Sequence, residues 1–215
     1  MTQTPSSYLT LARDAVAETE VKRSRFRCTL RRVEDEAGAR RVVEALRKEH
    51  WDARHHCSAF VLGPPPGRVE RPSDDGEPAG TAGAPMLEVL RGAGVSDVVA
   101  VVSRWFGGTL LGAGGLVRAY GDAVRAGLDE AGTRRRTLVR EHLLDLDHAD
   151  AGRIESELRS RGVAVVGSEY AAVVTLRLGV PPDEEARLAA VVAELTAGAG
   201  ETRVAGERWV DSLPS

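Results

Sequence analysis

The stretch VVAVVSRWFGGTLLGAGGLVRAYGDAV (Val98–Val124) changes character twice along its length. It begins as an unbroken apolar run, passes through five glycines in the nine residues from Gly107 to Gly115, and ends in an amphipathic repeat. The run predicts a central strand covered on both faces, and the repeat predicts a helix with one buried side. The stretch is therefore typical of a strand that leads into a helix through a glycine-rich loop.

The glycine-rich loop matches neither standard nucleotide motif. A P-loop needs a lysine and a hydroxyl residue after its last glycine, and the dinucleotide fingerprint needs a glycine where Val117 stands. The N–H groups of Gly114, Gly115 and Leu116 would nevertheless point outward at a helix N-terminus, which favours an anion. Arg104 would supply a charged donor to the same anion. The alternative is a tight turn with Arg104 in an internal salt bridge.

A second motif, SDDGEPAGTAG (73–83), places three carboxylates on a loop: Asp74, Asp75 and Glu77. These acids could hold a hard cation such as magnesium, or receive an arginine-rich partner. They could instead form a turn, for which Asp before Gly is a strong signal. Because the spacing fixes no further ligand, no metal site is predicted. A third alternative is that these acids pair with Arg104, joining the two glycine-bearing segments at one surface.

Composition and charge narrow the function classes. Of the 215 residues, 42% are hydrophobic and 28% are charged, as in folded proteins of one large or two modest domains. The net charge of −3 gives no global basic field, so nucleic-acid binding would have to be local. The sequence shows no secretion signal, no membrane-length apolar run and only two cysteines. We therefore expect a cytoplasmic protein with no membrane association, cofactor or metal.

The apolar patterns predict two domains with a boundary near Thr133. The first domain, residues 1–133, is expected to have strands over 8–21, 25–33, 54–63 and 96–105, helices over 34–50, 85–92 and the segment after the glycines, and a long loop over 68–85. The second domain, residues 138–212, is expected to follow the ferredoxin-like βαββαβ order over 138–146, 149–161, 163–170, 171–180, 183–196 and 201–210. The segment TRRRT (133–137) is predicted as a basic joint.

Three consecutive residues, His55, His56 and Cys57, are candidates for catalysis or metal binding. In a strand they alternate between faces, so adjacent members cannot grip one metal. Nothing identifies a third group to orient a Cys–His pair, so we predict a buried Cys57 and hydrogen-bonded histidines. The three tryptophans are predicted at core or rim positions, because no interleaved basic and aromatic residues accompany them.

Four stretches resemble the IMPACT family in its bacterial, YigZ-type branch: KRSRF (22–26), HHCSAF (55–60), SDDGEPAGTAGAPML (73–87) and VVSRWFGGTLLGAGGLVRAYGDAV (101–124). With the C-terminal half, the resemblance spans nearly the whole chain. It implies an α+β protein of two domains. The first is an α/β sandwich like the second domain of a small-subunit ribosomal protein, and the other is ferredoxin-like, as in domain V of elongation factor G. The chain departs from the family's pattern at Arg54, where a small hydroxyl residue is expected, and at Ser58, where an aromatic is common.

Residues of the two long motifs form the predicted anion- or nucleic-acid-binding surface: Asp74, Asp75, Glu77, Arg104, Gly107, Gly108, Gly112, Gly114 and Gly115. The resemblance attaches no catalytic role to them. For the bacterial branch it implies association with RNA or the ribosome and a role in translation regulation, by fold analogy. The leading hypothesis is therefore a non-enzymatic protein that binds RNA or a ribosome-associated partner. Two alternatives stay open, an enzyme acting on a small anionic or phosphorylated substrate at this surface and a protein-interaction module, as does the oligomeric state.

Overall fold

The computed structural model describes residues 6–211, and the chain divides into two compact units, Met1–Arg135 and Arg136–Ser215. We call them unit 1 and unit 2 and describe each by itself. The first five residues of the predicted N-terminal domain, and Ser212 at the end of the predicted C-terminal domain, lie outside the described residues. No helix within residues 6–211 is long and apolar enough to cross a membrane.

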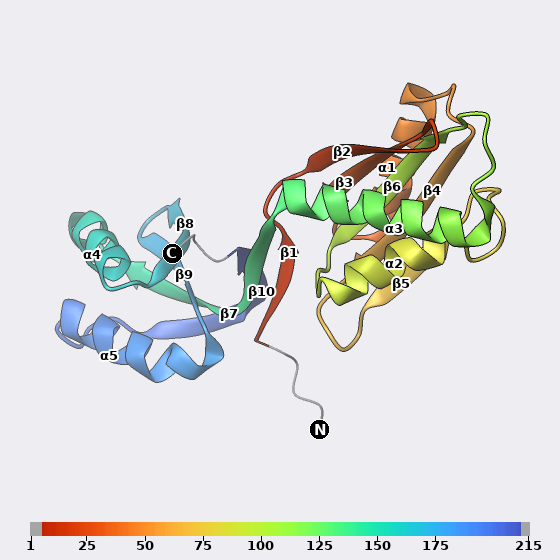
Figure 1. Ribbon diagram of the computed structural model, residues 1–215. Helices are drawn as coiled ribbons and strands as arrows, with labels where there is room; N and C mark the ends of the chain where they lie inside the picture. The colour runs from red at the N-terminus through yellow and green to blue at the C-terminus, as the bar shows by residue number, and fades with distance from the viewer. Residues whose placement is uncertain (1–5, 212–215) are drawn as a thin grey trace. The chain divides into compact units, whose positions relative to one another are not determined.

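Unit 1 is built around a five-stranded antiparallel sheet in the order β2-β3-β6-β4-β5. Its elements in chain order are β1 (Ser7–Leu11), β2 (Ala15–Val21), β3 (Ser24–Arg32), α1 (Glu36–Glu49), β4 (His55–Leu62), β5 (Val69–Ser73), α2 (Gly83–Gly92), β6 (Val98–Trp105) and α3 (Gly112–Ala131). Helices α2 and α3 lie on one face of the sheet and α1 lies on the other (Figure 1). The unit therefore has three layers with the sheet in the middle.

Strand β6 lies at the centre of this sheet because both of its faces are apolar. Val98, Ala100 and Val102 pack in the core under α2 and α3, whereas Val99 and Val101 pack in the core under α1. All five side chains are fully buried. The prediction of a central strand covered on both faces is confirmed.

Two segments of unit 1 differ from the sequence prediction. The strand expected over 8–21 is two strands, β1 and β2, separated by a bend at which the Ala12 N–H donates to the Gly132 carbonyl. The loop expected over 68–85 contains β5, an edge strand paired with β4. An edge strand exposed on its outer side needs neither an apolar repeat nor the N–H that Pro72 lacks. The pattern of residue types therefore carried no signal for this strand.

Unit 2 has an antiparallel sheet in the order β10-β7-β9-β8. Its elements are β7 (Thr133–Leu146), α4 (His148–Ser160), β8 (Ala164–Tyr170), β9 (Val174–Val180), the 3₁₀ turn η1 (Pro182–Glu184), α5 (Glu185–Leu195) and β10 (Thr202–Asp211). Helices α4 and α5 share with the sheet a separate core that includes Leu144, Ile154, Leu176 and Leu188. This is the βαββαβ order, so the predicted α+β fold of two domains is confirmed.

The segment TRRRT is the first part of strand β7, and the boundary between the two units, after Arg135, falls within it. Arg135 donates a hydrogen bond to the Ser7 hydroxyl at 2.9 Å, and Arg136 lies 3.5 Å from a carboxylate oxygen of Asp211. Like β5, this half-exposed strand start has no apolar alternation. Arg135 and Arg136 therefore already have partners within the chain.

Candidate functional site

Four loops of unit 1 meet at one end of its sheet. Strand β6 ends there at Trp105, and its antiparallel neighbours β3 and β4 begin there at Ser24 and His55. Strand β5 runs antiparallel to β4 and ends at Ser73 on the same side. We call this the loop end, seen at the upper right of Figure 1 and made of residues 22–23, 50–54, 74–82 and 106–111. The two sequence motifs therefore share one end of the sheet.

Asp74 fixes the conformation of residues 74–82, which we call the acidic loop. Its carboxylate accepts the backbone N–H groups of Gly80, Ala82 and Gly83 at 2.7, 3.0 and 2.8 Å. Burial by itself would raise the pKa of Asp74, but these three hydrogen bonds outweigh it and the pKa is lowered. Asp74 is therefore ionised at neutral pH, and it occupies the N-terminus of α2, where unpaired N–H groups favour negative charge.

Asp75 ties the same loop to α1 and β4. Its carboxylate accepts the backbone N–H of His56 and the guanidinium of Arg47, both at 2.7 Å, and its carbonyl oxygen lies 2.8 Å from His55 Nδ1. Because a carbonyl oxygen only accepts, Nδ1 of His55 carries the proton in this contact. His56 Nε2 contacts the His50 carbonyl at 3.2 Å. The prediction of hydrogen-bonded histidines is confirmed.

A buried ion pair joins the acidic loop to β6. Glu77 Oε1 accepts from Arg104 at 2.5 Å and from the Tyr120 hydroxyl at 2.8 Å, and only 8% of Glu77 and 6% of Arg104 are exposed. Beside them, the Cys57 thiol donates to the Asp74 carbonyl at 2.9 Å, and burial raises its pKa to about 12. The two charges therefore neutralise each other inside the unit, and the thiol stays protonated and weakly nucleophilic at neutral pH.

Of the three acids considered as partners of Arg104, only Glu77 pairs with it. Asp74 and Asp75 are hydrogen-bonded to other groups. The alternative in which the acids of this loop pair with Arg104 therefore holds for Glu77 alone. Arg104 consequently offers no free charge to an approaching anion, and the anion-binding role of the predicted surface stays a prediction. Within residues 6–211, no group of three His, Cys, Asp or Glu side chains is arranged to hold a metal ion.

The glycine loop is fixed to the β2–β3 turn by direct backbone contact. A Cβ atom at Gly107 would lie 2.0 Å from the carbonyl carbon of Arg23, so only glycine fits at this position. The Gly107 N–H donates to the Ser24 hydroxyl at 3.1 Å. The loop therefore holds a fixed position on the sheet despite its glycine content.

Helix α3 begins where the glycine loop ends, and its first turn contains Gly114 and Gly115. No side chain caps this N-terminus, and Gly112, Ala113 and Gly114 are exposed. The N–H groups left free at the start of α3 are therefore those of Gly112, Ala113 and Gly114, because Gly115 and Leu116 donate within the helix. An anion at this N-terminus stays a prediction.

The loop end and the adjoining start of β3 carry four exposed cations that the sequence interpretation did not gather into one surface: Lys22, Arg23, Arg25 and Arg54. In the described part of the chain, no carboxylate forms an ion pair with any of them. Glu20 faces Arg25 across β2 and β3 without pairing, and the Arg25 guanidinium carbon instead lies 4.0 Å from the centre of the Trp105 ring. Lys22, Arg23 and Arg25 lie in one stretch, and the antiparallel register of β3, β6 and β4 brings Arg54 to the same end of the sheet.

The four acids within the loop-end segments are all engaged. Asp52 accepts the indole N–H of Trp105 at 2.9 Å, and Asp74, Asp75 and Glu77 have the partners given above. Glu77 is buried and Asp74 and Asp75 are partly buried, whereas Asp52 and the neighbouring Glu20 are exposed. The charges that an outside ligand meets at this surface are therefore four cations and two acids.

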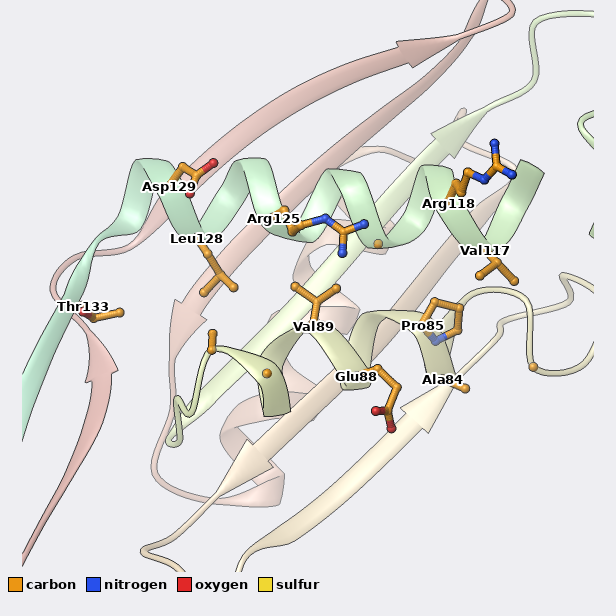
Figure 2. Close-up of a pocket in the computed structure, with 14 residues that line it drawn as sticks. Ala84, Pro85, Glu88, Val89, Val117, Arg118, Arg125, Leu128, Asp129 and Thr133 are labelled. Atoms are coloured by element: carbon orange, nitrogen blue, oxygen red, sulfur yellow. The ribbon is translucent and has the colours of Figure 1, made fainter. Parts of the chain in front are cut away.

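A separate cavity of about 930 Å³ opens between α2 and α3 (Figure 2). Val89 of α2 and Leu128 of α3 line its middle, and Pro85 and Val117 line one end. The lining is largely apolar, and the cavity lies on the helix layer rather than among the loop-end cations. We assign it no role in binding a charged ligand.

Both units match models of known protein families. Residues 22–128 match the Impact N-terminal domain, and residues 144–199 match a domain of unknown function, DUF1949. The fold and these matches define a two-domain α+β protein of the Impact type, in which all four loop-end segments fall within the first match. The chain belongs to the IMPACT family.

Relatives cover almost the whole chain. The IMPACT family member YigZ of Escherichia coli is 42% identical over 89% of this chain and 95% of its own, and YvyE of Bacillus subtilis is 40% identical over 92% and 90%. A solved structure described as that of a hypothetical protein is 40% identical, with a TM-score of 0.65 over 92% of this chain and 97% of that one. The family resemblance expected from the sequence is confirmed.

Proposed function

We propose that the protein binds RNA through the loop end of unit 1 and does so in the cytoplasm, in association with translation. The observation that carries this proposal is the set of exposed cations Lys22, Arg23, Arg25 and Arg54, which form no ion pair within residues 6–211 and outnumber the exposed acids beside them, Glu20 and Asp52. Cations that are not neutralised within the protein can neutralise RNA phosphates and release their counterions, which supplies most of the affinity for a polyanion.

The start of α3 supports the same proposal. The N–H groups of Gly112, Ala113 and Gly114, which no side chain caps, can donate to a phosphate oxygen at the end of the glycine loop. RNA is chosen over other polyanions because both domains resemble folds of the translation machinery, which is an argument from analogy. The free, buried cysteines Cys28 and Cys57 suit a reducing compartment.

Arg104 has a different role in this proposal from that of the surface cations. Its guanidinium is buried against Glu77, so it positions the acidic loop and does not contact phosphate. Replacing Arg104 would therefore test folding more than binding, and surface variants are needed to test binding.

The experiment is the affinity of the full chain for a labelled RNA with a hairpin and a single-stranded flank, measured by fluorescence anisotropy. We expect Arg25→Gln and Arg54→Gln each to weaken binding by about threefold to tenfold, because each removes one phosphate contact. Arg41→Gln, which removes an exposed arginine from α1, serves as the matched control and should bind like the wild type. Equal affinities for all three variants would overturn the proposal.

A further inference from the structure

One large aromatic side chain at the loop end is almost wholly exposed. Trp51, between α1 and β4, is 82% exposed, although tryptophan is usually mostly buried. The backbone around it is held in place: the Ala53 N–H donates to the His50 carbonyl at 2.9 Å, and the Arg54 N–H donates to the Arg104 carbonyl at 3.0 Å. The indole is therefore displayed on an ordered segment.

The neighbouring tryptophan is in a different situation. Trp105 donates its indole N–H to Asp52, is covered by the Arg25 guanidinium and meets the His50 ring edge-on at 5.5 Å between centroids. Trp51 makes no ring, cation or hydrogen-bond contact of this kind within residues 6–211. Trp105 thus fixes the loop in place, and Trp51 has both ring faces free.

Exposed charges of both signs flank Trp51 in the chain. Glu49 and Asp52 are exposed acids, and Arg54, three residues after Trp51, is an exposed cation without an acid partner within residues 6–211. A second ring of the loop end, that of Phe106, is 44% exposed just after β6. Exposed rings beside free cations are the combination by which proteins hold single-stranded nucleic acid, with bases on the rings and phosphates on the cations.

We propose that Trp51 is a stacking platform for an unpaired base, so that the RNA held at the loop end is single-stranded. The inference rests on the proposed function and makes it specific. In a duplex, neighbouring bases cover each base face, and the protein contacts backbone and 2′-hydroxyl groups. An exposed indole then finds no base face on which to stack. An unpaired base exposes its face and gains a stacking partner.

The test compares two RNA probes with the full chain: an oligoadenylate of about 12 nucleotides and a blunt RNA duplex of about 12 base pairs. Trp51→Ala should lower the affinity for the oligoadenylate about tenfold, while Trp51→Phe, which keeps an aromatic face, should stay within about threefold of the wild type. Affinity for the duplex should be the weaker of the two and equal in wild type and Trp51→Ala. Quenching of tryptophan emission by oligoadenylate should be smaller in Trp51→Phe, because Trp105 is already covered.

Two outcomes would overturn the inference while leaving RNA binding intact. One is wild-type affinity of Trp51→Ala for oligoadenylate together with weaker binding by Arg54→Gln. The other is an equal loss of affinity for both probes in Trp51→Ala. Failure of the wild type to bind either RNA would instead overturn the proposed function itself.

Discussion

At the scale of single residues, Glu77 connects the acidic loop to β6 and α3. Its carboxylate receives both the Arg104 guanidinium and the Tyr120 hydroxyl, and all three groups are buried. A buried ion pair adds little net stability when complete, but removing one member leaves the other charge buried without compensation. The pair therefore makes the position of the acidic loop sensitive to a single carboxylate.

We expect Glu77→Ala to lower the free energy of unfolding by about 3 kcal/mol, because the Arg104 charge loses its partner. Tyr120→Phe, which removes one hydrogen bond to a charged group, should cost about 1 to 2 kcal/mol. The control is Glu36→Ala, which removes an exposed acid paired with Arg40 at 3.2 Å and should cost about 0.5 kcal/mol. Urea unfolding followed by tryptophan fluorescence measures all three. A Glu77→Ala loss no larger than that of Glu36→Ala would contradict the role assigned to the pair.

The two buried thiols predict a loss of stability in alkali. Burial raises the pKa values of Cys28 and Cys57 from 9.0 to about 12, so the folded protein keeps thiol protons that the unfolded chain releases. Their contribution is full below about pH 9 and falls between about pH 9 and pH 12, by roughly 1.4 kcal/mol per pH unit for each thiol. Burial also raises the pKa of Tyr120, so the folded protein keeps this proton and loses further stability above about pH 10, where a tyrosine of the unfolded chain ionises.

The contribution of the thiols is isolated by measuring unfolding free energies from pH 8 to 11 in the wild type and in Cys28→Ala/Cys57→Ala. The wild type should lose stability more steeply, and Tyr120 contributes to both slopes. Parallel slopes would show that the thiols titrate alike in the folded and unfolded chain.

At the scale of elements, the glycines of the loop before α3 have separate roles. Gly107 lies against the backbone of Arg23 and Ser24, which cannot move aside as a side chain can. Gly114 lies in the first turn of α3 with no atom within 4 Å of the place a Cβ would take. The first glycine is required for close packing, and the second is not.

Gly107→Ala should therefore destabilise unit 1 by about 2 kcal/mol or more, through overpacking of the loop against the β2–β3 turn. Gly114→Ala should leave stability unchanged or raise it by up to about 1 kcal/mol, because alanine is the better helix former. Thermal and urea unfolding of the two variants give the comparison. Equal effects of the two substitutions would mean that the contact at Gly107 does not fix the loop.

The elements that the sequence predicts well are those with an apolar face. Strand β6 is apolar on both sides, and the helices and strands of unit 2 follow their buried positions, so their residue types carry a signal. Strand β5 and the start of β7 are exposed, and nothing in their residue types demands a strand. For the site, the sequence located both motifs and allowed the pairing of Arg104 with a nearby acid. It could not show that Arg25, Arg54 and Trp51 converge, because their proximity arises from strand register and not from spacing along the chain.

At the scale of the whole molecule, net charge gives a misleading picture of binding. The chain carries a formal charge of −3, yet the loop end of unit 1 and the start of β3 present four exposed cations beside only two exposed acids, Glu20 and Asp52. Association with a polyanion then depends on the local field and should be strongly sensitive to ionic strength.

The most direct test of RNA binding at the loop end is the affinity of the full chain for single-stranded RNA over a salt series. Binding to phosphates predicts that the logarithm of the association constant falls linearly with the logarithm of salt concentration. It also predicts a slope shallower by about 1.4 in Arg25→Gln/Arg54→Gln, because each phosphate contact contributes about 0.7, and an unchanged slope in Arg41→Gln. A wild-type slope near zero, or the same slope in the double variant as in the wild type, would contradict RNA binding at the loop end.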